Sequence, residues 1–335
     1  MINGLNTMTD NILRWGIIGC GDVTEKKSGP AFRKIGGSAL TAVMRRDAAR
    51  ARDYAERHGV PVWYDDAHAL INDPGVDAIY IATPPDAHEE LAIAAMSAGK
   101  PVYVEKPMAT TVAACERMLE VSENTGMKLS IAHYRRAVPM FAQIRSWIDG
   151  GEIGTIRTVR ISMLQADRPE SLEDPRIRWR VTPENGGPGG HFYDLAPHQL
   201  DLMLHFFGKV TAFQGFGINQ AGSYPARDAV CGSIVFDNGI LFTGQWAFTV
   251  NEAHAEDVCE IQGTTGKLVF QFFGNRVEIT RQGVKMAVNF EHPEHIQQPM
   301  IEQVTAYFKG IGDNPCSAED AIASMRIMEA FIQQA

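Results

Sequence analysis

Short apolar runs that alternate with helical segments characterise the first part of the chain. Four runs have the pattern of buried parallel strands, over residues 13–18, 39–44, 78–83 and 101–104. Segments with helical composition and spacing lie between or after them, over residues 48–58, 67–71 and 89–97. A helix over residues 112–125 and a strand over 128–132 extend the series. Strands that alternate with helices predict right-handed β-α-β crossovers and a doubly wound parallel sheet.

The pattern changes after residue 132. Longer segments now alternate apolar with polar residues, over residues 158–164, 233–236, 240–248, 258–262, 267–272 and 276–280. Asp237-Asn238-Gly239 is a strong hairpin turn between two of them. We therefore expect an α/β Rossmann domain over residues 12–132. An α+β domain with an open, largely antiparallel sheet follows over 133–335, and its last helix is expected to pack back on the first domain.

Composition and charge narrow the class of protein. A chain of 335 residues with 45% hydrophobic and 21% charged residues suits two globular domains. The net charge of -9 argues against nucleic acid as a partner. The five cysteines are scattered and form no C-x-x-C pair, so neither a metal site nor a disulfide framework is predicted. No signal peptide or membrane span is evident, and we expect a cytoplasmic protein.

A glycine turn follows the first predicted strand and reads Gly19-Cys20-Gly21-Asp22-Val23-Thr24. Two glycines at a strand end let the backbone approach a pyrophosphate near a helix N-terminus, as in dinucleotide-binding folds. Thr24 stands where the third glycine or alanine of that fingerprint is normal. A plain glycine turn would be the simpler interpretation of the motif alone, but the surrounding β-α-β pattern favours cofactor binding by Gly19, Gly21, Asp22, Val23 and Thr24.

The end of the second strand bears on the choice of cofactor. Enzymes that prefer NAD usually carry an acidic residue there, whereas this chain has Arg45-Arg46-Asp47. A guanidinium at this position would pair with a 2′-phosphate, so NADP is expected in preference to NAD, with Arg45 and Arg46 as contacts. The alternative is that both arginines are a solvated helix entry and that Asp47 is a helix cap.

The residues expected to take part in binding and catalysis show a resemblance to a known family. Glu105-Lys106-Pro107 ends the fourth strand, and Ala82-Thr83-Pro84-Pro85 with His88 ends the third. A glycine-rich run, 186–190, then leads to Asp194 and His198, with Asp201 continuing the pattern. This combination resembles the glucose-fructose oxidoreductase/inositol dehydrogenase/rhizopine-catabolism family nearly end to end. Pro197 and Thr24 depart from the family pattern, and neither departure removes a catalytic side chain.

The resemblance implies an NAD(P)-dependent oxidoreductase that acts on CH-OH groups of a sugar, polyol or related small molecule. It implies that His198 is the acid/base, that Lys106 polarises the reacting oxygen and that Asp194 orients the substrate. Further cofactor contacts would come from Thr83, Pro84, His88, Glu105 and Lys106. A homodimer or homotetramer through the C-terminal sheet is also expected.

Helical spacing puts Asp194 and His198 on one face of a helix, and Pro197 suggests that both lie near its N-terminus. An N-cap role for Asp194 and a structural role for His198 are the alternatives at the level of single residues. Two other segments are candidates for the substrate pocket, through His133, Tyr134, Arg178 and Trp179. Their alternative role is core packing and surface ion pairs. An arginine facing the pocket, at 178 or 180, would favour an acidic or phosphorylated sugar.

Two rival functions fit the same two domains. One is a glycosidase that uses a tightly held NAD for transient oxidation. The other is a non-catalytic regulator that senses nucleotides, although a regulator has no need to retain Lys106, Asp194 and His198 together.

Overall fold

The first sheet of this computed structural model, which describes residues 12–168 and 170–333, is parallel throughout. Its order is β3-β2-β1-β4-β5-β6. This is the doubly wound order, in which the strand sequence reverses between β1 and β4 and ligands bind outside the carboxyl ends. The predicted fold of this part is confirmed. The strands are β1 (Leu13–Ile18), β2 (Ser38–Met44), β3 (Val62–Tyr64), β4 (Ala78–Ile81), β5 (Val102–Val104) and β6 (Leu129–Ile131).

Helices cover both faces of this sheet, so β4, β5 and β6 are buried along their whole length. Capping residues set several helix ends. The side chain of Asp47 accepts a hydrogen bond from Arg50 N, and Gly59 ends the same helix in the left-handed region, with φ of 61°. The helices are α1 (Asp22–Lys26), α2 (Ala31–Lys34), α3 (Ala48–His58), α4 (Ala67–Ile71), α5 (His88–Ser97) and α6 (Val112–Thr125), with a 3-10 turn η1 (Pro85–Ala87) before α5.

The second sheet has the order β14-β13-β12-β11-β7-β10-β9-β8, and only the pair β7 and β10 is parallel. The predicted turn at Asp237-Asn238-Gly239 joins β9 to β10, as expected. The sequence pattern did not reveal the edge strands β8 and β14. They are largely exposed, so they lack a clean apolar alternation. The strands are β7 (Ile156–Ala166), β8 (Val210–Ile218), β9 (Ala229–Phe236), β10 (Leu241–Val250), β11 (Glu256–Gly263), β12 (Gly266–Phe270), β13 (Arg276–Arg281) and β14 (Val284–Asn289).

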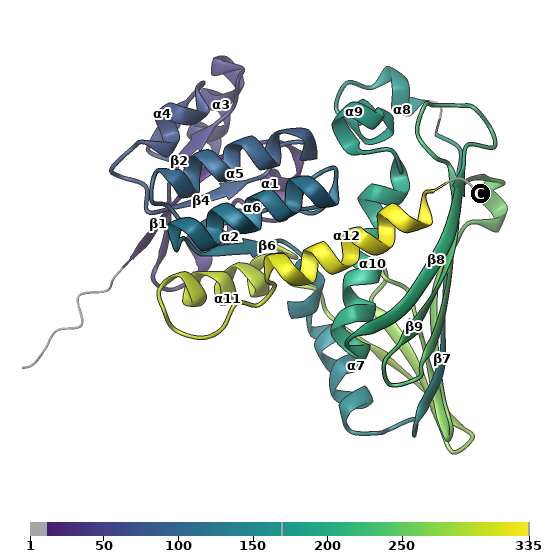
Figure 1. Ribbon diagram of the computed structural model, residues 1–335. Coiled ribbons are helices and arrows are strands. Elements are labelled where there is room, and N and C mark those ends of the chain that lie inside the picture. Colours follow the sequence, from purple (N-terminus) through teal and green to yellow (C-terminus); the bar gives the residue numbers. More distant parts are fainter. Residues whose placement is uncertain (1–11, 169, 334–335) are drawn as a thin grey trace, which may run out of the picture.

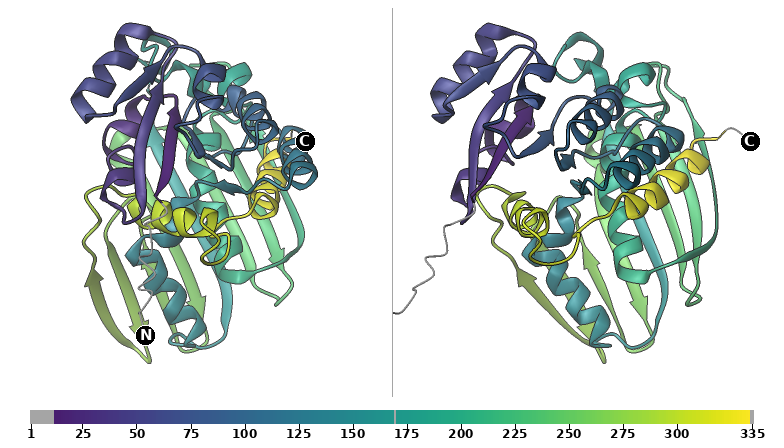
Figure 2. Two further views of the ribbon diagram at one scale, coloured as in Figure 1. Left: turned by 90° about the vertical axis from the view of Figure 1, so that its left-hand side faces the viewer. Right: turned by 60° about the vertical axis from the view of Figure 1, so that its left-hand side comes forward.

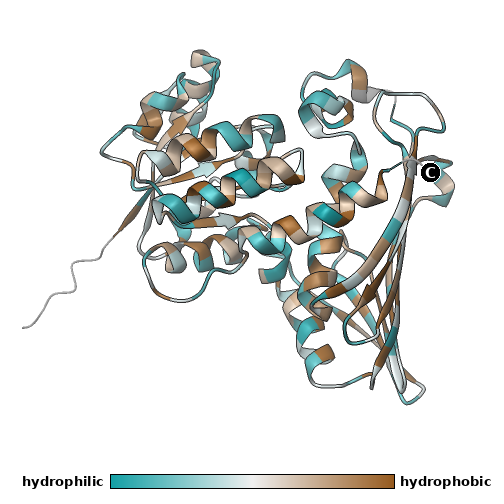
Figure 3. Ribbon diagram, in the orientation of Figure 1, coloured by the Kyte–Doolittle hydropathy of each residue, from teal (hydrophilic) through white to brown (hydrophobic). Residues whose placement is uncertain are grey.

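Helices lie on only one face of the second sheet, the face toward the first domain (Figures 1 and 2). The strands carry both hydrophobic and hydrophilic residues (Figure 3), and buried positions alternate with exposed ones along much of β9 and β10. The long helices are α7 (Pro139–Asp149), α10 (His191–Phe207), α11 (Gln298–Phe308) and α12 (Ala318–Phe331). Short turns complete the chain, namely η2 (Tyr134–Ala137), α8 (Glu170–Glu173), η3 (Arg178–Val181), α9 (Pro183–Gly186) and η4 (Glu252–His254).

The last helix joins the two parts of the molecule (Figure 1). Helix α12 packs on α6 and β6 of the first domain and on α10, β8 and β9 of the second. Glu329 accepts a hydrogen bond from Val112 N, at 2.6 Å, where α6 begins. On the other side, a Cβ at Gly232 would lie 2.4 Å from the Phe331 ring, so glycine is needed for this close approach.

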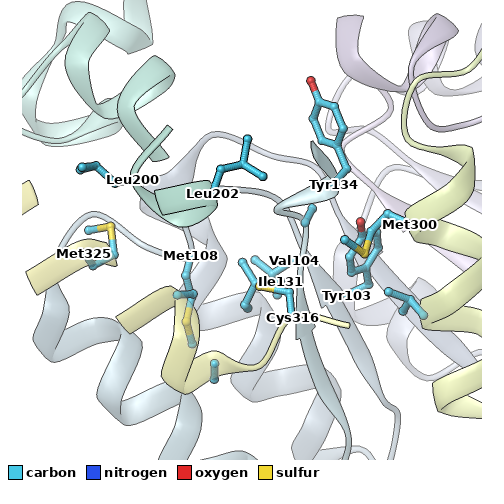
Figure 4. Close-up of a cluster of buried hydrophobic side chains, with 14 of the residues drawn as sticks. Tyr103, Val104, Met108, Ile131, Tyr134, Leu200, Leu202, Met300, Cys316 and Met325 are labelled. Carbon is cyan, nitrogen blue, oxygen red and sulfur yellow. The ribbon is translucent and has the colours of Figure 1, made fainter. Parts of the chain in front are cut away.

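Buried side chains from both domains form one continuous core at the junction (Figure 4). They come from β5, β6, α10, α11 and α12, and include Val104, Ile131, Leu202, Met300 and Met325. The domain division at residues 132 and 133 stays a prediction. In the described part of the chain, no helix is long and apolar enough to cross a membrane.

Candidate active site

A groove of about 760 Å³ lies at the carboxyl ends of β1, β2 and β4. Its first wall is the glycine turn after β1, together with the ends of β2 and β4. Gly19 has φ of 95°, and a Cβ there would lie 2.8 Å from the backbone carbonyl carbon of Ala82. Only glycine can take this conformation so close to the neighbouring strand. The groove and its turn fit a dinucleotide whose pyrophosphate lies against the start of α1.

The groove gathers most of the residues that the sequence predicts for cofactor binding. Its lining includes Gly19, Gly21, Asp22, Val23, Arg45, Arg46, Thr83 and Pro84. Arg45 is fixed by a hydrogen bond of 3.0 Å from its Nη1 to the carbonyl oxygen of Cys20. Asp47 also borders the groove, and its side chain caps α3 as the alternative interpretation expected. Arg50, which the sequence analysis missed, follows one turn later on α3.

Two predicted cofactor contacts are buried instead. Thr24 is fully buried, and its Oγ1 donates to the carbonyl oxygen of Gly21 at 2.8 Å. His88 is also fully buried, with Nδ1 3.1 Å from the Pro107 carbonyl oxygen and Nε2 2.9 Å from that of Thr83. The structure corrects the expectation for both residues, because they support the turn and the loop from behind the groove.

Glu105 is likewise turned inward. Its Oε1 accepts hydrogen bonds from Tyr80 Oη at 2.6 Å and from Gln297 Nε2 at 2.7 Å, and its Oε2 accepts one from Lys106 N at 3.1 Å. A buried carboxylate needs such partners. Glu105 therefore holds the end of β5, and with it the backbone of Lys106, instead of lining the groove as expected.

The structure brings Lys106 and Asp194 into direct contact. Lys106 Nζ donates to Asp194 Oδ1 and to the Asp194 carbonyl oxygen, both at 2.8 Å. Arg180 Nε donates to Asp194 Oδ2 at 2.9 Å. Burial alone would raise the pKa of Asp194, but the two cations hold that pKa well below its usual range. Asp194 is thus an ionised carboxylate with a cation on each oxygen.

Helix α10 presents these groups. It begins at His191, after Gly190 at φ of 56°, so Asp194 lies in its first turn but is not its N-cap. Pro197 lies inside the helix, one turn later than the sequence analysis expected. The helix nevertheless continues to Phe207, and His198 follows Asp194 by one turn.

His198 is 5% exposed, and its ring lies 5.1 Å from that of Tyr134 and 6.1 Å from that of Phe273. Its Nδ1 is buried without a hydrogen-bond partner among the described residues. Burial lowers the pKa of His198 well below the usual range, and the positive charges of Lys106 and Arg135 lower it further. The imidazole is therefore neutral at pH 7, and one of its ring nitrogens can accept a hydrogen bond.

The remaining predicted substrate residues separate into two groups. Tyr134 lies beside His198, and Trp179 lines the groove. His133 is buried, with Nδ1 3.8 Å from Asp201 Oδ1. Arg178 is exposed, and its Nε donates to the Leu172 carbonyl oxygen at 2.7 Å, so its expected place in the pocket is corrected.

Sequence reasoning left one residue of the site undecided and missed another. Arg180 was named with Arg178 as an arginine that could face the pocket, but nothing in the Arg-Trp-Arg sequence distinguishes the two arginines. Phe273 comes from the β12–β13 turn, is 46% exposed and has the Arg135 guanidinium 4.3 Å from its ring centre. No local pattern connects Phe273 to His198.

The fold and the site together define a nicotinamide-nucleotide-dependent oxidoreductase, and comparison with known proteins gives the family. A model described as "Oxidoreductase family, NAD-binding Rossmann fold" matches residues 13–133, and the GFO/IDH/MocA C-terminal domain matches 141–269. The chain belongs to the GFO/IDH/MocA oxidoreductase family, and it is a dehydrogenase or reductase.

Individual relatives of this chain are also oxidoreductases. Oxidoreductase P35 of Formosa agariphila is 39% identical over 319 residues, which are 95% of this chain and 98% of the relative. The structure of a levoglucosan dehydrogenase with NADH and levoglucosan aligns with a TM-score of 0.84 at 22% identity, over 95% of this chain and 96% of the other. A 3-ketoreductase from Actinomadura kijaniata with NADP and TDP-benzene aligns with a TM-score of 0.80 at 23% identity, over 96% and 97%.

Proposed function

We propose that the protein transfers a hydride between a nicotinamide cofactor and a hydroxyl or carbonyl carbon of a sugar, a polyol or a related small molecule. The observation that carries the proposal is the contact between Lys106 and Asp194, with His198 one helical turn away. Arg180 lines the cofactor groove and binds the same Asp194 carboxylate, so this trio adjoins the groove. A levoglucosan dehydrogenase has the same fold, and its structure contains NADH and levoglucosan.

Each side chain of the trio has a separate task in this proposal. When bound, the nicotinamide supplies the hydride acceptor or donor. His198 is neutral and takes the hydroxyl proton during oxidation. Lys106 has three ammonium hydrogens, of which Asp194 takes two, so the third is available for the reacting oxygen. Asp194 holds Lys106 in place.

We further propose NADP as the preferred cofactor. Arg45, Arg46 and Arg50 border the groove after β2, where the 2′-hydroxyl or 2′-phosphate of the adenosine would lie. The carboxylate of Asp47, which lines the groove beside these arginines, already accepts the amide hydrogen of Arg50 at 3.1 Å. It is therefore less able to accept a hydrogen bond from a ribose hydroxyl. Solved structures of this fold include complexes with either NADH or NADP.

We also propose that the protein forms a homodimer or homotetramer through the second sheet. The face of this sheet without helices carries exposed apolar side chains, Phe216, Ile218 and Leu241 among them. A shallow hollow of about 330 Å³ runs across its strands. Exposed apolar side chains are costly to leave in water, and a second copy of the chain would cover them.

A substrate panel tests the proposed reaction. Sugars, polyols and their oxidised forms are assayed with NAD(H) and NADP(H) by nicotinamide absorbance, for the wild type and for Lys106→Met and His198→Ala. We expect net turnover by the wild type only, while all three proteins bind the nucleotide, because the trio lies outside the glycine turn. Unchanged turnover in either variant contradicts the proposed site. Glycoside cleavage without net change in NAD(P)H would instead support transient oxidation, the rival reaction.

A further inference from the structure

Arg180 stands between the cofactor groove and the proposed catalytic trio. It lies in η3, close to the groove wall formed by Pro175, Arg176 and Trp179. Its guanidinium is 4.6 Å from the centre of the Trp179 ring, which supports it from one face. Its Nε bonds to Asp194 Oδ2. This side chain is thus held in a defined place at the edge of the proposed substrate site.

Most N–H groups of the Arg180 guanidinium make no hydrogen bond to the described residues. Only Nε makes a hydrogen bond within the described part of the chain, so the four N–H groups on Nη1 and Nη2 have no protein partner there. The Arg180 side chain is 28% exposed, which makes these donors accessible from the groove. The free edge of a guanidinium matches the two oxygens of a carboxylate.

The charges of the site also leave a positive excess. Lys106 and Arg180 share the single carboxylate of Asp194, which leaves one positive charge in a partly buried place. Arg135 is a further cation near His198, but the carboxylate of Asp257 acts on it electrostatically and offsets its charge, so the excess stays at one positive charge. An isolated charge away from water is unfavourable unless a ligand of the opposite sign pairs with it.

We propose that the substrate is an acidic sugar whose carboxylate binds the free edge of Arg180, a specification that rests on the proposed function. A single carboxylate carries the one negative charge that the site lacks, whereas a phosphate monoester would bring almost two. The carboxylate is a handle and takes no part in the redox step. A neighbouring carbinol carbon gives its hydride to the cofactor and its hydroxyl proton to His198, and becomes a carbonyl carbon.

Matched substrates test this inference. Each hexuronate is compared with the hexose that differs only at C6, where a hydroxymethyl group replaces the carboxylate, and with the hexose 6-phosphate. We expect the wild type to favour a hexuronate over its hexose by about 10- to 100-fold in kcat/KM, the usual effect of a charge-assisted pair. Arg180→Gln should remove this preference, mainly through the KM of the acid, and Arg180→Lys should restore part of it.

Arg178→Gln is the matched control, because Arg178 is two residues away and bonds to a carbonyl oxygen outside the groove. It should keep the wild-type ratio. Since Arg180 also holds Asp194, kcat for both substrates will fall in Arg180→Gln, and the ratio of the two substrates is the decisive quantity. Thermal unfolding and nucleotide binding show that each variant is folded.

Several results would overturn the inference. These are equal or better turnover of the neutral hexose, a preference for the 6-phosphate, and an acid-to-neutral ratio that Arg180→Gln leaves unchanged. A rise only in the KM of the cofactor would assign Arg180 to the nucleotide instead. In all these cases the proposed hydride transfer would still stand. If the wild type turns over no sugar, sugar acid or polyol with either cofactor, the proposed function fails, and this inference with it.

Discussion

Replacing Asp194 with asparagine tests the central contact of the site. The amide keeps the shape of the carboxylate but loses its charge, and one of its two ends then presents N–H donors to a cation. Lys106 and Arg180 lose their shared partner, although their hydrogen bonds of 2.8 and 2.9 Å are only partly buried. Removing one partner of a fully buried pair costs roughly 3–5 kcal/mol. Because water can reach both cations here, we expect a loss of about 2–3 kcal/mol in the free energy of unfolding.

Activity should fall more than stability. Lys106 would no longer be held at the reacting oxygen, so we expect kcat/KM to decrease by about 100- to 1,000-fold. Urea denaturation and steady-state kinetics at pH 7 measure the two effects. Asp149→Asn is a matched control, since Asp149 pairs with Arg145 at the exposed surface of α7, away from the groove, and it should alter neither quantity. Asp194→Asn with wild-type stability and kcat/KM within about threefold of wild type would refute the reasoning.

The pH dependence provides a second check on the same pair. The pKa of Asp194 is lower in the folded protein than the value of about 3.9 in an unfolded chain. Its contribution to stability is therefore complete above pH 4 to 5 and is lost as the pH falls through the folded pKa. The stability difference between wild type and Asp194→Asn should stay constant from pH 7 to about pH 5 and shrink below about pH 4.

Four further outcomes follow from the structure. Arg45→Asp should raise the KM for NADP at least about 10-fold more than the KM for NAD. Arg52→Asp, a control outside the groove, should change neither KM. An equal effect of Arg45→Asp on both cofactors would contradict the proposed phosphate contact. Asp201→Asn removes a buried carboxylate that lies 2.6 Å from a guanidinium, and urea denaturation should show a loss of about 3–5 kcal/mol. Because the pKa of His198 is lowered, kcat/KM for oxidation should stay flat from pH 8 to about 6.5, and a titration near pH 6.5 would contradict this. Phe216→Glu should shift sedimentation toward the monomer without unfolding the chain, whereas an unchanged wild-type oligomer would exclude this face.

Much of the fold could be predicted because it depends on local patterns. Apolar runs that end at a glycine turn indicated a parallel strand, and the turn at Asp237-Asn238-Gly239 indicated a hairpin. The edge strands β8 and β14 were missed, since strands with little burial leave little hydrophobic pattern. The beginning of α10 was also misplaced. Pro197 favoured a helix that begins just before it, but the packing of that helix on the second sheet outweighs the missing hydrogen bond.

Residue types by themselves did not show which side chains face the groove. Arg178 and Arg180 flank the same tryptophan, and only the path of η3 brings the second one to Asp194. Glu105 and His88 belong to the motifs that carry the family resemblance, yet both are buried and bonded to groups behind the groove. A motif identifies neighbours in sequence, whereas the direction of each side chain depends on the surrounding packing.

The sequence by itself determined the doubly wound sheet and the glycine turn, and its resemblance to a family made Lys106, Asp194 and His198 candidates. Periodicity and turn chemistry are local properties, so they can be read without the fold. Only the tertiary structure decided that Lys106 contacts Asp194, that Arg180 binds the second oxygen of the Asp194 carboxylate and that Phe273 lies beside His198. These contacts join residues as many as 88 positions apart in the chain, and the packing of α10 and α12 between the two sheets creates them.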